Sequence, residues 1–168
     1  MRLWHKDFLS VLPHQQLLGQ WRECCCIAAS LANEHTPNHI LVNRILDYPC
    51  GDYEKFCSLV YFEMTNSGFS ITPTVKKKLE TDLRAWRLYL GEELPWNWEV
   101  DKDDFSLLNY YLSGDNPEAP IIFENWHNKQ YLRQCYYNLE EKYDCGGIPE
   151  KEWEAVTMQY VILGGAMR

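Results

Sequence analysis

The sequence lacks any long apolar run. No stretch of roughly 18 uncharged apolar residues occurs, and a membrane-spanning helix needs about 20. The first residues, MRLWHKDFLSVLP, also lack the apolar stretch of a secretory signal peptide. No internal repeat or low-complexity tract is present. We therefore expect a protein that is located in the cytoplasm and does not bind a membrane.

The seven cysteines lack the spacing of a metal site. Structural zinc sites use spaced pairs such as C-x-x-C, and this sequence contains none. The run Cys24–Cys26 places three thiols side by side, about 100° apart on a helix. His35 and His39 are four positions apart, but Pro37 interrupts the helix that would pair them. We expect no metal ion and no cofactor, and interpret the cysteines as free thiols on the buried side of a helix.

Basic residues are scarce in one segment of the chain. Residues 90–124 contain nine acidic residues and one basic residue, Lys102, which accounts for the whole net charge of −8. The rest of the protein is balanced, with 15 acidic and 15 basic residues. The same segment is rich in tryptophan and tyrosine, at Trp96, Trp98, Tyr110 and Tyr111. We interpret it as an acidic, aromatic-rich insertion and as a possible surface for a protein partner.

Apolar residues with helical spacing occupy most of the remaining chain. Leu17, Trp21, Ala28 and Leu31 recur at intervals of three and four. The sequence predicts an all-α, compact, mostly helical single domain over residues 1–168, with 90–124 as the insertion. The predicted helices cover residues 14–34, 38–47, 52–66 with Asp52 as N-cap, 73–90, about 105–112 and 127–143, with a short last turn from Pro149 toward Trp153.

Two charged motifs are candidate binding residues. Arg22-Glu23 lies beside the apolar stripe of the first long helix, where such a pair is usually a solvated face. The run Lys76-Lys77-Lys78 follows the start of the helix at 73–90, and it too is usually a solvated face. The sharper interpretation of the lysine run is contact with phosphate groups.

The residues around Arg22-Glu23 resemble a known family. The segment SVLPHQQLLGQWRE, weaker matches at NHILVNRILDY and FEMTNSGFSI, and a further match at HNKQYLRQCYYNLEEK are similar to the pyrimidine-dimer DNA glycosylases of the endonuclease V type. The resemblance covers about 110 of the 168 residues, and the acidic segment has no counterpart. It implies a compact helical fold, as the apolar spacing does independently.

The resemblance also implies an activity. Such enzymes cut the glycosidic bond of UV photoproducts and then nick the backbone, using the N-terminal α-amine as nucleophile and one glutamate. An α-amine, with a pKa of about 7.7–8.0, is far closer to the neutral form at pH 7 than a lysine. The implied catalytic residues are Met1, as Schiff-base nucleophile, and Glu23, as proton relay. The implied partner is double-stranded damaged DNA, bound by Arg2 and Arg22, with His39 and Lys76, Lys77 and Lys78 as weaker contacts.

Two registers of the N-terminus are open. A gapless alignment back from Glu23 puts Arg2 in the place of the nucleophile, whereas a slip of one residue puts Met1 there and is the register we expect. Two other functions are alternatives: a catalytically inactive or repurposed relative that acts as a protein-interaction module through residues 90–124, and a lyase that acts on RNA or a small sugar-bearing substrate.

Overall fold

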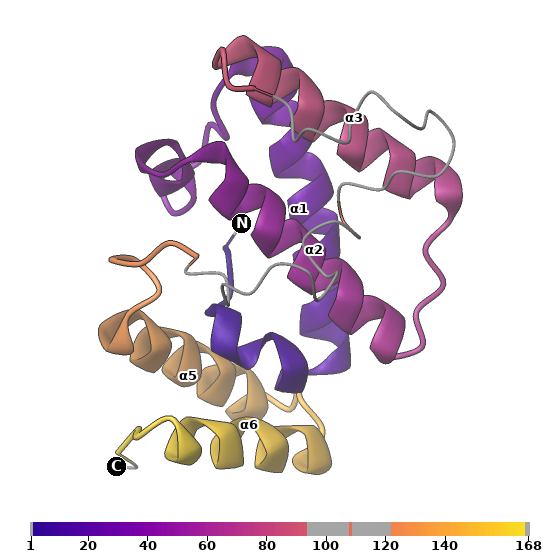
Figure 1. Cartoon of the computed structure of the whole chain (residues 1–168). Helices are drawn as coiled ribbons and strands as arrows, with labels where there is room; N and C mark the ends of the chain where they lie inside the picture. The colour runs from indigo at the N-terminus through magenta and orange to yellow at the C-terminus, as the bar shows by residue number, and fades with distance from the viewer. Residues whose placement is uncertain (1, 94–107, 109–121, 167–168) are drawn as a thin grey trace.

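The computed structural model describes residues 2–93, 108 and 122–166. The described part is helical and contains no strand, which confirms the predicted all-α class (Figure 1). Its elements are η1 (Lys6–Val11), α1 (His14–Glu34), η2 (Asn43–Asp47), α2 (Cys50–Asn66), α3 (Pro73–Tyr89), α5 (Lys129–Asp144) and α6 (Glu150–Ile162), where η is a 3-10 helix.

The helices form two groups. Helix α1 packs against both α2 and α3, while α5 packs against α6, and η1 contacts α2 on one side and α6 on the other. Figure 1 shows α5 and α6 together at one end of the molecule, with the short N-terminal segment running between them and the α1–α3 group. The first residues of the chain therefore lie between its first and last helices.

The apolar stripe of α1 is buried as its spacing predicts. Leu17, Trp21, Ala28 and Leu31 are all buried in the hydrophobic core. The cysteines follow this stripe only in part, because consecutive helical residues point about 100° apart. Cys24 is buried, but its neighbours in the Cys24–Cys26 run are half-buried and exposed, respectively. The expectation that the run forms the buried side of the helix thus holds for Cys24 alone.

The predicted helix over residues 38–47 is wrong. Residues 39–43 form a turn in which His39 C=O accepts hydrogen bonds from Val42 and Asn43, and only the 3-10 helix η2 follows. Asn38 has a left-handed backbone (φ 53°), which a continuous α-helix excludes. The side chain of Asn43 also accepts a hydrogen bond from the His39 N–H, so a local side chain replaces helical pairing.

The C-terminal helix is longer than its sequence indicated. Instead of a short turn that ends near Trp153, α6 continues for 13 residues to Ile162. Val156 and Tyr160 are buried on its inner face, and Tyr160 stacks on Tyr136 of α5 with ring centroids 3.9 Å apart. This tertiary packing extends the helix where the sequence shows only a weak amphipathic pattern.

Asp52 is not the N-cap of α2. The helix begins at Cys50, after Pro49, and the Asp52 side chain instead accepts a hydrogen bond from the Phe123 N–H at 2.9 Å. Pro49 occupies the N-cap position, and its side chain has no oxygen that could accept a hydrogen bond from the first turn. Asp52 is thereby available to anchor residue 123, at the end of the acidic segment.

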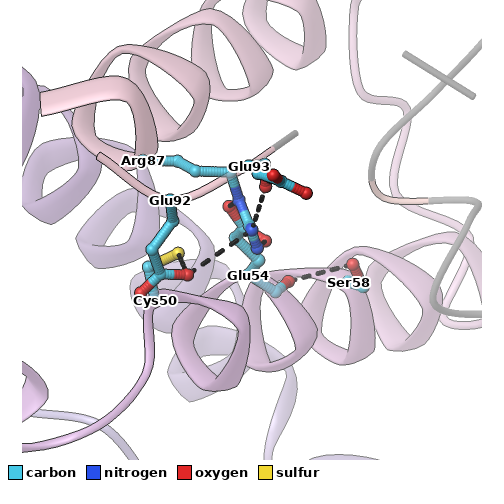
Figure 2. Close-up of polar contacts among 6 residues, drawn as sticks. All are labelled: Cys50, Glu54, Ser58, Arg87, Glu92 and Glu93. Carbon is cyan, nitrogen blue, oxygen red and sulfur yellow. Dashed lines mark hydrogen bonds and ion pairs between the residues drawn. The ribbon is translucent and has the colours of Figure 1, made fainter. Parts of the chain in front are cut away.

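A buried polar cluster holds α3 against α2 (Figure 2). The guanidinium of Arg87 makes two hydrogen bonds to the carboxylate of Glu54, which is fully buried, at 2.8 and 2.6 Å. Arg87 also donates to Glu92 and to the carbonyl of Glu93, while the Cys50 thiol donates to Glu92 at 2.9 Å. The start of the acidic segment is therefore tied to the first turns of α2, the same helix that anchors its end.

Candidate active site

The N-terminal segment is hydrogen-bonded to one face of α1. The Arg2 backbone N–H donates to Glu23 Oε2 at 2.7 Å, and the Trp4 N–H donates to Gln20 Oε1 at 2.7 Å. Gln20 and Glu23 are three positions apart, so both side chains project from the same side of the helix. In an extended segment, residues two apart point to the same side. The N–H groups of Arg2 and Trp4 can therefore both reach these acceptors.

The opposite side of the segment is held by α5. The Tyr131 hydroxyl donates a hydrogen bond to the Leu3 carbonyl oxygen, and Leu3 itself is fully buried. Burial raises the pKa of Tyr131 well above its ordinary value, so the hydroxyl keeps the proton that it donates. Glu23 and Tyr131 thus hold neighbouring residues of the segment from two different helices.

A pocket of about 400 Å³ opens beside this contact. Its lining combines the N-terminal segment, the Glu23 face of α1, the turn before η2 and the middle of α5: Arg2, Trp4, Gln16, Gly19, Gln20, Glu23, Leu41, Asn138, Glu141 and Lys142. A second pocket of about 270 Å³ shares Arg2, Leu41 and Asn138 with it and extends to Tyr131. The Glu23 carboxylate and the nitrogen of Arg2 are therefore at the wall of a cavity that solvent reaches.

The charges at the pocket are mixed. The Arg2 guanidinium lies over the Trp4 ring, 5.4 Å from its centroid, which fixes a cation at the rim. Glu23 is half-buried, and Glu141 and Lys142 add one charge of each sign from α5. A carboxylate beside a fixed cation and an open cavity can accept a proton from a bound molecule while the cation binds an anionic group.

Two stacked histidines support the segment next to the pocket. The rings of His5 and His127 are 5.1 Å apart, and both side chains are buried. His127 Nδ1 accepts a hydrogen bond from the Lys6 N–H at 3.0 Å, so it is unprotonated at that nitrogen. Burial lowers the pKa of His127 to about 2, and nearby His5 and Lys6 act in the same direction. Burial also lowers the pKa of His5, although the Asp7 carboxylate opposes the shift.

The structure brings together two of the residues that the sequence singled out, Arg2 and Glu23. Met1 lies outside the described residues. Arg22 is exposed on α1, about 100° around the helix from Glu23 and outside the lining of the pocket. His39 belongs to the turn that contributes Leu41 to the pocket, and its Nδ1 accepts a hydrogen bond from the Leu41 N–H.

The lysine run is divided among different environments on α3. The Lys76 amine lies over the Tyr61 ring, 4.9 Å from its centroid, and Lys78 pairs with Asp82. Lys77 is exposed. None of the three is among the residues that line the described pockets. The structure therefore does not join the run to the pocket, and its contact with phosphate stays a prediction.

The sequence did not indicate Gln20, Tyr131 or Leu41 as site residues. The only available signal for Gln20 was its position one helical turn before Glu23. Tyr131 and Leu41 reach the pocket through contacts between distant parts of the chain, which residue spacing does not report. The acidic segment lies outside the described residues except for 90–93, 108 and 122–124, so Trp96, Trp98, Tyr110 and Tyr111 and the helix expected over about 105–112 are outside them, apart from residue 108.

Comparison with known proteins identifies the N-terminal part of the chain. Residues 1–77 match the model of a family described as pyrimidine dimer DNA glycosylase. This stretch contains Arg2, Glu23 and the Leu41 turn, and it confirms the resemblance over just under half of the chain. It supports a function of the DNA glycosylase type, with DNA as the substrate class. No curated protein and no solved structure matches the chain.

Among the residues that the structure describes, no helix has the length and hydropathy needed to cross a bilayer. The same ranges contain no group of three or more His, Cys, Asp or Glu side chains that could hold a metal ion. All seven cysteines are free thiols.

Proposed function

We propose that this protein is a DNA repair glycosylase with abasic-site lyase activity. Its substrate would be double-stranded DNA that carries UV pyrimidine dimers or related base damage. The observation that carries the proposal is the 2.7 Å hydrogen bond from the Arg2 N–H to Glu23 Oε2 at the wall of the pocket. It supports a site in which the N-terminal amine and a carboxylate act on the same sugar.

The proposed reaction needs only these two groups. The neutral α-amine attacks C1′ of the damaged nucleotide, and the C1′–N glycosidic bond breaks, so that the base leaves with the bonding electrons. The departing base takes up a proton from water. Glu23 takes the proton that the newly bonded amine loses and passes it to the ring oxygen, which opens the sugar and leaves an iminium at C1′. The iminium acidifies C2′, whose proton goes to Glu23. Electrons then move toward C3′ and expel the 3′ phosphate, which nicks the strand.

The two registers differ in which nitrogen is the α-amine. If Met1 is retained, the amine belongs to the residue that precedes the Arg2 contact. If Met1 is removed, the nitrogen that already contacts Glu23 becomes the α-amine. The mass of the purified chain separates the two, and Met1 remains the nucleophile that we propose.

The proposed DNA contacts follow the positions of the cations. Arg2 at the pocket rim and exposed Arg22 would bind phosphates on either side of the lesion, with His39 and Lys76–Lys78 further out. The lesion must leave the base stack for an amine to reach C1′, since stacking shields that atom. A cytoplasmic location and a protein partner at residues 90–124 are further predictions of the sequence.

The test is borohydride trapping on a duplex with one abasic site, followed by mass mapping of the cross-linked peptide. We expect a covalent adduct at the N-terminal peptide, lost after acetylation of the α-amine. Glu23→Gln should lose strand nicking. Its matched control is Glu34→Gln, at the exposed end of α1, which should nick like wild type. An absent adduct, with the N-terminus confirmed free, would contradict the proposal and favour an interaction module.

A further inference from the structure

The turn beside the pocket presents two apolar side chains to solvent. Ile40 is 85% exposed and Leu41 51%, and Ile40 has the highest exposure among the large apolar side chains described as exposed. Leu41 lines both pockets next to Arg2. An isolated exposed apolar residue is common on protein surfaces. Two in succession at the edge of a candidate active site indicate contact with a ligand.

The turn is held rigidly. His39 C=O accepts hydrogen bonds from Val42 and Asn43, both at 2.9 Å, and His39 Nδ1 accepts one from Leu41 at 3.3 Å. Asn43 Oδ1 also accepts a hydrogen bond from the His39 N–H at 3.0 Å, which links the two ends of the turn. Val42 is fully buried and anchors the turn in the core. The exposure of the two apolar side chains is therefore a property of an ordered turn and does not come from a loose backbone.

The turn faces α5 across the N-terminal segment. Leu41 shares the larger pocket with Asn138 of α5, while Arg2 and Glu23 belong to the same lining. Figure 1 shows residues 38–47 projecting as a loop from the α1–α3 group, on the side where the stretch before α5 lies. A nucleic acid whose sugar reaches Glu23 would meet the turn at the same time.

We propose that Ile40 and Leu41 form a wedge that enters the base stack of duplex DNA and fills the space left by an extruded nucleotide. This inference rests on the proposed function and assigns positioning residues to it. Unstacking a base step costs free energy, and proteins that bend DNA commonly insert apolar side chains between the separated bases. Isoleucine and leucine suit the role because they are large, apolar and without charge.

The test compares Ile40→Ala/Leu41→Ala with wild type on two abasic substrates. On a duplex, where the stack must be opened, we expect at least a tenfold loss of strand nicking. On a single-stranded abasic oligonucleotide, which needs no extrusion, Ile40→Ala alone, whose side chain is outside the pocket lining, should nick within twofold of wild type, although it loses nicking on the duplex. The variant Ile40→Leu/Leu41→Met should restore duplex nicking. The control Val161→Ala/Ile162→Ala removes two exposed apolar side chains of α6 and should match wild type on both substrates.

A binding measurement tests the wedge separately from catalysis. The probe is a duplex with a tetrahydrofuran abasic analogue, which cannot form an imine, next to a 2-aminopurine whose fluorescence rises on unstacking. Wild type should raise the fluorescence severalfold, and the double alanine variant should lose most of the rise. Equal fluorescence for both, or equal losses on duplex and single strand, would overturn the wedge. If wild type forms no trapped adduct, the proposed chemistry fails, while the fluorescence result still decides the wedge.

Discussion

The backbone nitrogen of Arg2 and the carboxylate of Glu23 are in direct hydrogen-bond contact across 21 positions of sequence, at 2.7 Å. Gln20, one turn earlier on α1, holds Trp4 in the same way. The N-terminal segment therefore has a fixed position relative to a carboxylate. A nucleophile at the N-terminus gains effective concentration from such positioning.

Glu23→Gln tests the role of the carboxylate. The amide oxygen can still accept the Arg2 hydrogen bond, so we expect a preserved fold but a loss of strand nicking of about 10²-fold or more. Nicking of a duplex with one abasic site, with thermal melting as the check on folding, measures both. Nicking at the wild-type rate would exclude Glu23 as the proton relay.

Arg22→Ala tests a phosphate contact outside the pocket. Log affinity falls as log salt concentration rises, and each phosphate neutralised adds about 0.9 to the steepness of that fall. We therefore expect the slope of Arg22→Ala to be shallower by about that amount. Titration of a duplex at several salt concentrations gives the slope. Lys151→Ala, an exposed cation on α6, should leave it unchanged. An unchanged slope for Arg22→Ala would remove it from the interface.

His127 predicts a loss of stability in acid. Its pKa is lowered to about 2 from 6.5, so below pH 6.5 the unfolded chain binds a proton that the folded protein excludes. The free energy of unfolding should fall by about 1.4 kcal/mol per pH unit from this group. Urea unfolding between pH 7.5 and 5 measures the dependence. Removing the group in His127→Gln should reduce the dependence, with His5, whose pKa burial also lowers, accounting for part of the remainder, and two parallel curves would contradict this origin.

The buried ion pair of Figure 2 predicts a large effect of one substitution. Arg87→Met leaves the fully buried Glu54 carboxylate without its guanidinium, which costs about 3–5 kcal/mol of unfolding free energy. Lys78→Met breaks a pair whose lysine is 63% exposed and should cost about 1 kcal/mol or less. Chemical denaturation of both variants gives the comparison. Equal losses would show that burial does not set the strength of these pairs.

Local pattern predicted most of the helices but not the site. The apolar spacing of α1 and the prolines at helix starts are local signals, and they predicted α1 and the course of α2 and α3 closely. The turn at 39–43 was missed because Asn43 satisfies the His39 backbone with its side chain. The end of α6 was missed because it depends on Tyr160 stacking on another helix.

The site residues also divide into those that local sequence indicated and those that depend on tertiary contacts. Glu23 was found through a resemblance carried by a continuous stretch of sequence. Gln20 and Tyr131 were not, because their role depends on reaching residues 16 and 128 positions away. Contacts of that separation are set by the tertiary packing of helices, which neither periodicity nor spacing describes.

The attachments of the N-terminal segment have a consequence for biosynthesis. Besides Tyr131, it depends on His127, which accepts from Lys6, and on Gln159, which donates to the Asp7 carbonyl. Residues 2–7 leave the ribosome well before these partners, which lie 121 to 152 positions later in the sequence. Leu3, which is buried in the folded protein, must therefore stay exposed to solvent until these partners have been made. A prematurely terminated chain would carry every residue of the family match and still have no assembled pocket.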